Sequence, residues 1–339
     1  MLTFILRRLA SLPLVMLALT LLIVGLLQFL SPRERAASFI KSENQMRNID
    51  LIIKENGLDQ PFYVQYWKWL GNATQGNFGF SKASSLPVLD TIIQRFPATL
   101  ELAIFASLFI IPIAVWLGTL SALGKDKFLD QMLRVISVIG YSLPVFVVGI
   151  LLLVVFYGAL GVLPGFGRTD TVLAITDPVP VVTGMITIDS ILAGKWNVLI
   201  NALQHMILPV MTLSIIQVAS TLKVMRNQLL DVLKADYVRT ARAKGLSDNM
   251  VNIKHARRNA ILPIVTLAGF TIQGLLSGAV ITETIFSYPG IGSWGATAAV
   301  QLDYAGVMGF ALFIGVIVVI SNLVIDILYS FFDPRVRFD

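Results

Sequence analysis

The sequence has no cysteine, only two histidines and few charged residues. The absence of cysteine excludes a disulfide-stapled domain, a thiolate metal site and a cysteine nucleophile. The two histidines, His205 and His255, are too few for a multi-histidine metal centre. Charged residues make up 14% of the chain, whereas a soluble domain carries about 25%. Too few are therefore present to cover a water-facing surface.

Hydrophobic residues are correspondingly abundant. They make up 56% of the 339 residues, and the mean hydropathy is +0.78. This apolar content excludes an intrinsically disordered chain. Together with the scarcity of charge it predicts an all-α polytopic membrane protein.

Six windows without a charged residue are long enough, or nearly so, to cross a bilayer, whose core of about 30 Å needs about 20 apolar residues of helix. The windows are Leu9–Leu30, Leu102–Leu123, Val135–Leu160, Met206–Leu222, Ile261–Thr282 and Tyr304–Ile325. Several contain proline, which membrane helices tolerate. The fourth window is the shortest. Its helix is expected either to include polar flanking residues or to be buried within the protein. The first is longer than the roughly 7–15 residues of a signal-peptide core, so we expect an uncleaved span.

The basic residues indicate how six spans would be oriented. Most of the 26 Lys and Arg residues fall on the side that holds both termini and the loop at 223–260. Positively charged segments stay in the cytoplasm, so both termini are expected there. The net charge of +6 is thus an orientation signal. No nucleic-acid partner is expected, because no soluble basic domain is present.

The spans divide the chain into a first transmembrane helix at 1–30, an external segment at 31–101 and a core domain at 102–339. The core domain holds five transmembrane helices and the cytoplasmic loop at about 223–260. Aromatic residues of the external segment either anchor it at the membrane surface or form the small core of an external cap; they are Tyr63, Tyr66, Trp67 and Trp69. Farther along, Val179–Leu192 is expected to be a surface loop because it is short and contains Asp189.

The cytoplasmic loop has the pattern of a helix, a break and a second helix. Asp236 is expected to cap a short helix over Tyr237–Lys244. Gly245 stands where a left-handed residue ends a helix. Ser247 is then positioned to cap the second, basic helix.

Motifs of enzymes are missing from the sequence. It contains no Gly-x-x-x-x-Gly-Lys-Ser/Thr phosphate loop and no His-Glu-x-x-His pair. No predicted span contains a chain of buried acidic residues for proton relay; Glu283 and Asp326 fall at the ends of their spans. We therefore expect no catalytic residue, metal site or cofactor in this chain.

The stretch Asp236–Gly245, followed by Ile261-Leu262-Pro263, resembles the EAA loop of ABC importer permeases. Its Thr-Ala-Arg-Ala-Lys-Gly-Leu version is similar to that of the dipeptide/oligopeptide (peptide/nickel/opine) family, although the acidic first position of the loop pattern is not retained. Further matches are Gly57–Pro61, Gly76–Ser81, Arg95–Leu102, Tyr141–Pro144, Glu283–Gly292 and Asp333–Arg335. The chain length and the large first external segment resemble the B-type permease of the pair.

The resemblance implies a type I ABC importer permease fold in a prokaryotic cytoplasmic (inner) membrane. Such a chain forms half of a translocation pore with a second permease. Two ABC ATPase subunits carry ATP and Mg, and an external binding protein delivers the substrate. Oligopeptides or dipeptides are the implied cargo. Oligosaccharides are an alternative, because Ser31-Pro32-Arg33 stands where the family often has Pro-Gly-Asp.

The same resemblance assigns ATPase coupling to the short cytoplasmic helix and its C-terminal turn. The residues are Asp236, Tyr237, Arg239, Thr240, Ala241, Arg242, Ala243, Lys244, Gly245 and Leu246. A helix this short is marginal by itself, so a partner protein is expected to dock on it. Helical spacing places Tyr237, Thr240, Ala241 and Lys244 on one face, and that face is the expected contact.

Candidate pore or helix-interface residues lie on two spans. They are Tyr141, Pro144, Thr271, Gln273, Gly274 and Gly278. Gly274 and Gly278 form a Gly-x-x-x-Gly pattern, which permits close helix approach. The pattern fits ordinary packing within the chain or a permease–permease interface along the pore. A self-sufficient channel or secondary transporter is the alternative class, but it predicts midplane charges or paired broken helices, and the sequence has neither pattern.

Overall fold

The computed structural model describes residues 2–36 and 48–332. The Asp333–Arg335 match and part of the predicted external segment lie outside these residues. The helices are α1 (Leu2–Leu27), α2 (Pro32–Ala36), α4 (Ile49–Asn56), α5 (Phe62–Thr74), α6 (Val88–Leu123), α7 (Phe128–Ser142), α8 (Val145–Leu152), α9 (Thr171–Thr176), α10 (Ile186–Leu192), α11 (Trp196–Val232), α12 (Asp236–Ala243), α13 (Arg258–Ala260), α14 (Leu262–Leu276), α15 (Val280–Ile285), α16 (Ile291–Val300) and α17 (Tyr304–Phe332). Two π-helical segments, η2 (Leu153–Ala159) and η3 (Met250–Arg257), continue α8 and precede α13. One antiparallel hairpin pairs β1 (Phe80–Ser81) with β2 (Leu86–Pro87).

Three helices of the described chain are long and apolar enough to cross a membrane: α6, α11 and α17. Two bent pairs raise the number to five if each pair is one span. α7 meets α8 and η2 at 103°, and η3 with α13 meets α14 at 48°. The apolar stretch found in α1, Pro13–Leu26, is shorter. The prediction of a helical membrane protein is confirmed, whereas the number six stays a prediction.

The third predicted window, Val135–Leu160, is not one continuous helix. α7 ends at Ser142, and the extended backbone of Leu143 and Pro144 separates it from α8. Proline lacks an N–H group and disfavours the helical conformation in the residue before it. Pro144 therefore accounts for a sharp break rather than a kink.

Two other windows also differ from the predicted spans. The fourth, Met206–Leu222, lies within α11, which has 37 residues and extends through polar sequence on both sides. The fifth ends early, because α14 stops at Leu276 and Gly278 adopts a φ of +101°. The chain then turns into the short helix α15.

The core of the bundle is built around α6 and α11, which pack along each other. α7 packs on α11, and α14 lies against α6 and α17. Small residues permit these approaches. A Cβ atom on Gly118 would lie 2.7 Å from Cβ of Met225, and one on Gly140 would lie 3.1 Å from Cβ of Ala219. α1 is held apart from this core and packs against α17.

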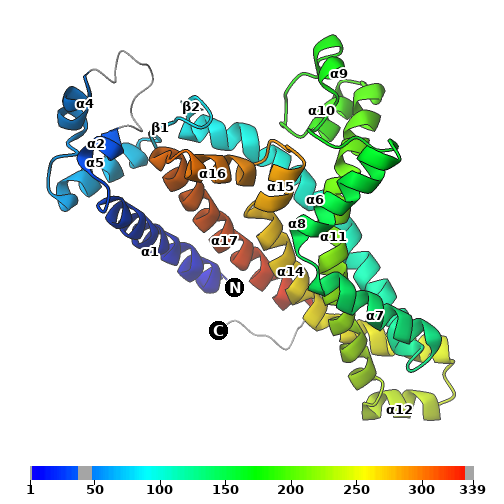
Figure 1. Ribbon diagram of the computed structural model, residues 1–339. Helices are drawn as coiled ribbons and strands as arrows, with labels where there is room; N and C mark the ends of the chain where they lie inside the picture. Colours follow the sequence, from blue (N-terminus) through cyan, green and yellow to red (C-terminus); the bar gives the residue numbers. More distant parts are fainter. Residues whose placement is uncertain (1, 37–47, 333–339) are drawn as a thin grey trace.

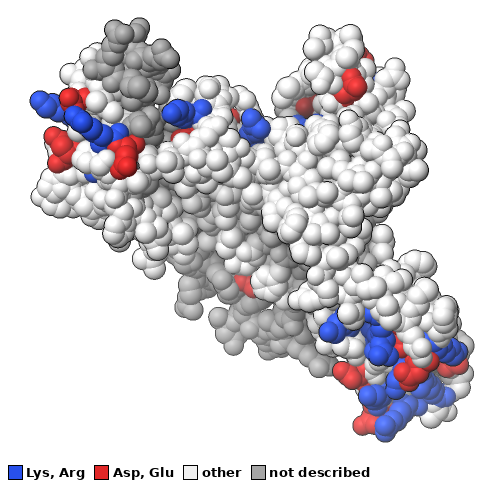
Figure 2. Space-filling model, in the orientation of Figure 1, with Lys and Arg blue, Asp and Glu red and all other residues white. Residues whose placement is uncertain are grey.

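The molecule has two distinct ends (Figure 1). α12 lies at one end, beyond α7 and the C-terminal part of α11. The helices α4, α9 and α10 and the β hairpin lie toward the other end. On the face shown in Figure 2, Lys, Arg, Asp and Glu gather mostly near these ends, and the surface between is almost uncharged. This distribution is that of a chain whose middle lies in a membrane.

The aromatic residues of the predicted external segment have two kinds of surroundings. Tyr66 is buried against Val24, Met308 and Leu312, and its hydroxyl lies 3.0 Å from Thr20 Oγ1. It thus belongs to a small core that joins α5 to α1 and α17. Tyr63 and Trp67 are 64% and 66% exposed, as residues at a membrane surface would be.

The surface loop over Val179–Leu192 was predicted partly from the charge of Asp189. The Asp189 side chain itself is not on the surface. Asp189 lies in α10 and is buried. Its carboxylate accepts hydrogen bonds from the backbone N–H groups of Val182, Thr183 and Gly184. The preceding turn is itself exposed at Val182, so the loop lies on the surface and folds around a buried carboxylate.

Candidate functional site

α12 is a short helix between α11 and η3, at the end of the molecule away from the β hairpin (Figure 1). It begins at Asp236, and the residue before it, Ala235, makes no side-chain cap. The prediction that Asp236 is the N-cap is therefore wrong by one residue. Its carboxylate instead accepts a hydrogen bond from Arg239 in the first turn, where a negative charge also suits the helix dipole.

The end of α12 follows the sequence prediction. Lys244 is the C-cap, and Gly245 adopts a left-handed φ of +77°. A residue with a β-carbon is disfavoured in that conformation. Ser247 then accepts a hydrogen bond from the N–H of Met250 at 3.4 Å, which starts the second leg of the loop as predicted.

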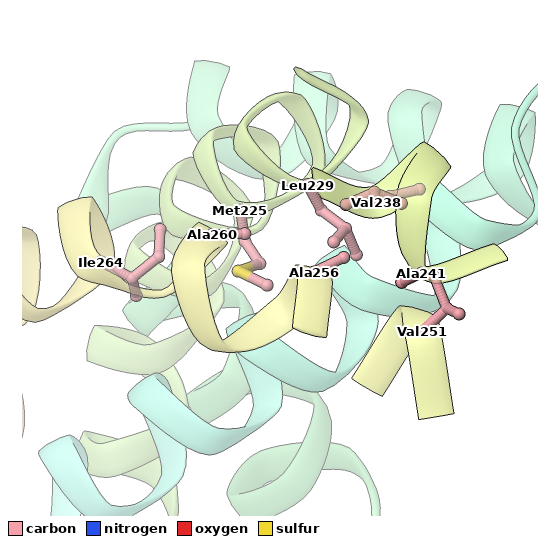
Figure 3. Packing of buried hydrophobic residues seen from close by; sticks show 9 residues of the cluster. Met225, Leu229, Val238, Ala241, Val251, Ala256, Ala260 and Ile264 are labelled. Atoms are coloured by element: carbon pink, nitrogen blue, oxygen red, sulfur yellow. The ribbon is translucent and has the colours of Figure 1, made fainter. Parts of the chain in front are cut away.

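One face of α12 is buried in an apolar cluster that Figure 3 shows from close by. We call it the loop cluster; its buried members are Ala122, Met225, Leu229, Val238, Ala241, Val251, Ala256, Ala260 and Ile264. Val238 and Ala241 come from α12, and the others come from α6, α11, η3, α13 and α14. The cluster therefore joins α12 to the nearby ends of several predicted spans.

The structure corrects the predicted docking face at one position. Ala241 is only 8% exposed and packs within its own chain, so it is not part of an outward face. Three of the four predicted residues, Tyr237, Thr240 and Lys244, are exposed. The Tyr237 hydroxyl also accepts a hydrogen bond from Asn259 Nδ2 at 2.9 Å, which ties the first leg of the loop to the second.

The outward face of α12 and its turn is polar and mainly basic. It consists of Asp236, Tyr237, Arg239, Thr240, Arg242, Ala243, Lys244, Gly245 and Leu246, all of them exposed. Figure 2 shows basic and acidic side chains together at this end. The helix is therefore fixed on its apolar side and exposes a side that carries three basic residues and one acidic residue.

A buried ion pair lies near the same end and was missed by the sequence analysis. Arg226 donates from Nε to Asp130 Oδ1 at 2.6 Å and from Nη2 to Asp130 Oδ2 at 2.7 Å. Asp130 also accepts from Ser121 Oγ at 2.5 Å and from the N–H of Asp126 at 3.0 Å. The pair joins α7 to α11 in a bidentate geometry. Both residues flank predicted spans, but nothing in the sequence pairs them.

The candidate pore residues fall on two separate parts of the bundle. Tyr141 and Pro144 are exposed at the break between α7 and α8. These helices pack on α11, α6 and α15, whereas α14, which carries the other candidates, packs on α6, α17 and α11. Thr271 donates its hydroxyl to the Leu267 carbonyl of its own helix. Gln273 Oε1 is buried and has no hydrogen-bond partner among the described residues.

The glycines near the end of α14 have different surroundings. A Cβ atom on Gly278 would lie 2.8 Å from the Gly292 Cα, so close packing within the chain explains this glycine. Gly274 is exposed, and a Cβ atom there would meet nothing within 4 Å. Ordinary packing within the chain therefore does not explain Gly274.

The opposite end of the molecule is held by buried carboxylates. Glu101 of α6 accepts from Arg168 Nη2 at 2.5 Å and from the N–H and hydroxyl of Thr187 at 2.7 and 2.6 Å. The hydroxyl of Tyr288 donates to the same carboxylate at 3.4 Å. Arg168 and Thr187 lie in the segment between η2 and α11, and Tyr288 lies between α15 and α16, so Glu101 joins both segments to α6.

Glu283 is a second buried carboxylate that the sequence analysis placed only at the end of a span. It accepts from Thr99 Oγ1 and from the N–H of Ser293, each at 2.8 Å. Burial raises the pKa of the Glu283 carboxyl above its ordinary value. A Cβ atom on Gly290 would meet this carboxylate, which explains a glycine there. Within the described residues no group of three or more His, Cys, Asp or Glu is arranged to hold a metal.

Known proteins were compared with the whole sequence. The family described as "Binding-protein-dependent transport system inner membrane component" matches residues 110–338. The corresponding N-terminal family, "Binding-prot-dependent transport system membrane comp, N-term", matches residues 1–103. The two matches meet inside α6.

Several relatives are similar over most of their length. The probable D,D-dipeptide transport system permease protein DdpB of Escherichia coli K12 is 41% identical over 85% of this chain and 84% of its own. The di/tripeptide transport system permease protein DppB of Pseudomonas aeruginosa is 39% identical over 99% of both chains. The glutathione transport system permease protein GsiC of Escherichia coli O1:K1 is 34% identical over all of both chains. With its apolar helices and the basic loop helix α12, this chain belongs to the binding-protein-dependent transport system inner membrane components, the permeases of ABC transporters.

Proposed function

We propose that this chain is one of two permeases in an importer of short peptides, and that α12 transmits the action of a partner ATPase to the pore. The observation that carries this proposal is the mounting of α12. Val238 and Ala241 are sealed into the loop cluster, while Tyr237 and Thr240 face outward. A helix held in this way offers a rigid surface that a partner protein can contact.

The loop cluster gives coupling a physical route. Met225 and Leu229 lie on α11, and Ala260 and Ile264 lie at the start of the α13–α14 unit. Protein cores are close-packed and transmit displacement. A partner that pushes α12 therefore moves the cytoplasmic ends of α11 and α14 together. The Asp130–Arg226 pair extends this connection to α7.

We assign the energy source to the partners. In this proposal two ABC ATPase subunits bind ATP and Mg, and the chain itself supplies no catalytic residue. An external binding protein delivers the cargo, and both termini with α12 lie in the cytoplasm. The topology has six spans, with α1 as the first.

The exposed side of α14 is assigned to the second permease. Gly274 leaves open space beside the helix, and Gln273 presents a buried oxygen without a partner in this chain. Close approach of a second helix at Gly274 would fill that space. A donor from the second permease would satisfy Gln273 Oε1.

Short peptides are the proposed cargo because the relatives are named for D,D-dipeptides, di- and tripeptides and glutathione. Oligosaccharides are the competing cargo. Uptake of labelled dipeptides and oligosaccharides by vesicles that contain the complete transporter distinguishes them. Uptake of the sugar alone would overturn the peptide assignment.

Coupling is tested with Thr240→Trp, which places a bulky ring on the exposed face of α12 without entering the loop cluster. We expect loss of uptake and of substrate-stimulated ATP hydrolysis, with normal membrane insertion. Thr176→Trp on the exposed helix α9 is the matched control. Normal stimulated ATP hydrolysis in Thr240→Trp would show that α12 is not the coupling contact.

Orientation is tested with Lys82→Cys, an exposed position beside the β hairpin in a chain without native cysteine. A membrane-impermeant thiol reagent should label it from outside intact cells. Labelling only from the cytoplasmic side would invert the proposed topology.

A further inference from the structure

The segment between η2 and α11, residues 160–195, exposes a group of aliphatic side chains at the end of the molecule opposite to α12. We call it the α9–α10 segment. The most exposed members, on α9 and the turn that follows it, are Val172 (68%), Ile175 (75%), Val181 (84%) and Val182 (69%). Single exposed apolar residues are ordinary on a soluble surface, but a group of them marks an interaction site. The surface over α9 and α10 is also mostly uncharged in Figure 2.

The charged residues of the α9–α10 segment all have partners within the chain. The segment contains Arg168, Asp170, Asp177, Asp189 and Lys195. Asp177 pairs with Lys195 at 2.7 Å, and Arg168 pairs with a buried carboxylate of α6. The carboxylates of Asp170 and Asp189 accept hydrogen bonds from backbone N–H groups of the same segment. The segment therefore engages its charges and exposes its apolar groups, which is the reverse of a soluble surface.

A second segment at the same end of the molecule has the opposite character. Within residues 48–87 the exposed charged side chains include Lys54, Glu55, Asp59, Lys68 and Lys82. Free charges are stable in water and costly in a medium of low polarity. The two segments therefore have different surroundings, and those of the α9–α10 segment are the less polar.

α11 sets the level of the α9–α10 segment relative to the membrane. No Lys, Arg, Asp or Glu lies between Lys195 and Lys223. The helix between these two lysines rises about 42 Å, at about 1.5 Å per residue. A bilayer with its headgroup layers is about 40–45 Å thick. Lys195 is therefore expected at the headgroup layer on the side of the membrane away from α12.

Both ends of α9 are attached to the first turns of α11. The N–H of Asp170 donates to Asn201 Oδ1 at 2.8 Å. Lys195 Nζ donates to the carbonyl of Pro178, which follows α9. α10 also packs on α11. The exposed aliphatic side chains of the segment are thus held close to the level of Lys195.

An apolar stripe on α11 leads to the same level. Its exposed residues follow one another at helical spacing and are Trp196, Ile200, Leu203 and Ile207. Ile191 and Leu192 of α10, which are 51% and 64% exposed, come shortly before them in the chain. A tryptophan next to a lysine is typical of the boundary between membrane and water. The exposed apolar surface of this span therefore continues into α10.

From these features we infer that the α9–α10 segment is a membrane anchor that lies in the headgroup layer. Val172, Ile175 and Val181 contact the acyl chains below that layer, and the lipid bilayer is the occupant of this surface. A soluble partner fits less well, because its release would return the aliphatic side chains to water, whereas the bilayer covers them at all times. The inference does not depend on the cargo, on ATP or on which side of the membrane is external.

Spin labels at single cysteines test the anchor, since the chain has no native cysteine. The transporter complex is placed in nanodiscs of dioleoyl phosphatidylcholine, with a nitroxide on Val172→Cys, Ile175→Cys or Val181→Cys. Collisions with oxygen, which concentrates in lipid, and with a water-soluble nickel chelate are measured for each label. Ile207→Cys on the stripe of α11 is the membrane reference, and Lys54→Cys on α4 is the water reference.

We expect the three labels of the segment to be several-fold less accessible to nickel than Lys54→Cys and to meet oxygen nearly as often as Ile207→Cys. Nickel accessibility equal to that of Lys54→Cys would overturn the inference, because the segment would then lie in water. Low accessibility to both reagents would also overturn it, since another protein would then cover this face. Protection from nickel that appears only after the external binding protein is added would make the surface a docking site for that protein instead.

A second measurement addresses the aliphatic side chains themselves. The double variant Val181→Asn, Val182→Asn makes the turn polar and leaves its backbone hydrogen bonds to Asp189 in place. A label on Val172→Cys in this variant should become more accessible to nickel and approach the water reference. Ser85→Asn, in the exposed turn of the β hairpin, is the matched control. Unchanged accessibility in an assembled double variant would show that these side chains do not hold the segment in lipid. If the double variant does not assemble, the single labels on the otherwise unaltered segment decide the question.

Discussion

The loop cluster at the α12 end and the carboxylate networks at the other end bury opposite kinds of side chain. At the α12 end the loop cluster is apolar and includes the small residues Ala241, Ala256 and Ala260, while the charges of α12 face outward. At the other end, Glu101 and Glu283 are completely buried and serve as hydrogen-bond acceptors for several segments. The loop cluster thus leaves the charges of α12 exposed, whereas the networks at the other end enclose two carboxylates.

This difference follows from what each end has to hold. Apolar packing is non-directional, so the loop cluster fixes a short helix while leaving its polar face free for a partner. Hydrogen bonds to a buried carboxylate are directional, and burial of the carboxylate costs free energy unless its oxygen atoms accept hydrogen bonds. Glu101 and Glu283 therefore fix irregular loops in one arrangement. The contrast predicts that substitutions at the two ends affect different properties.

The largest effect is expected for Glu101→Ala. It removes the acceptor of Arg168 and Thr187 and leaves a nearly buried guanidinium without its counter-ion. Breaking one partner of a buried pair costs about 3–5 kcal/mol. The measurement is the unfolding free energy of the purified chain in mixed micelles. A loss as small as that of Asp177→Ala, which removes a partly exposed ion pair with Lys195, would show that this network does not stabilise its end of the molecule.

A somewhat smaller loss is expected for Leu229→Ala in the loop cluster. Leu229 is fully buried, and truncating such a leucine costs about 2–5 kcal/mol. The loss should be concentrated in α12, which we expect to show faster amide hydrogen exchange. Truncation of the exposed Leu246 is the control. Unchanged exchange in α12 would mean that the cluster does not hold this helix.

A modest effect is expected for Gly245→Ala. The left-handed φ of +77° disfavours a β-carbon by roughly 1–2 kcal/mol. The change should loosen the turn after α12 and reduce coupling, while unfolding of the opposite end of the molecule stays the same. Stimulated ATP hydrolysis and hydrogen exchange measure the two parts. The control is Gly194→Ala, which places a β-carbon at another left-handed turn, far from α12. An equal loss of coupling in the two variants would show that Gly245 has no special role.

The smallest effect on stability is expected for Arg239→Ala. Its ion pair with Asp236 spans 3.3 Å, and both side chains are largely exposed, so its loss should leave stability nearly unchanged. Transport should nevertheless fall, because a basic contact for the partner is lost. Parallel measurements of unfolding and uptake test this separation. Full uptake would place the partner contact elsewhere on α12.

Local signals in the sequence predicted the helix α12 and the turn that follows it. The residues from Tyr237 to Gly245 specify a short helix and its end through neighbours only, and the left-handed Gly245 and the Ser247 contact were both found. The buried direction of Ala241 was not predicted. Which side of a short helix is covered depends on α11 and η3, and their positions are set by the whole bundle.

The apolar windows alone determined that the chain is a helical membrane protein, because charge-free segments of that length have few other stable environments. The sequence placed Pro144 inside one continuous span, and the 103° bend between α7 and α8 appears only in the structure, where both helices pack on α11. Glu101 meets Tyr288 and Thr187, residues far away in the sequence. Only the tertiary structure decides such pairings, because a buried carboxylate selects partners by distance and direction, and a linear sequence records neither.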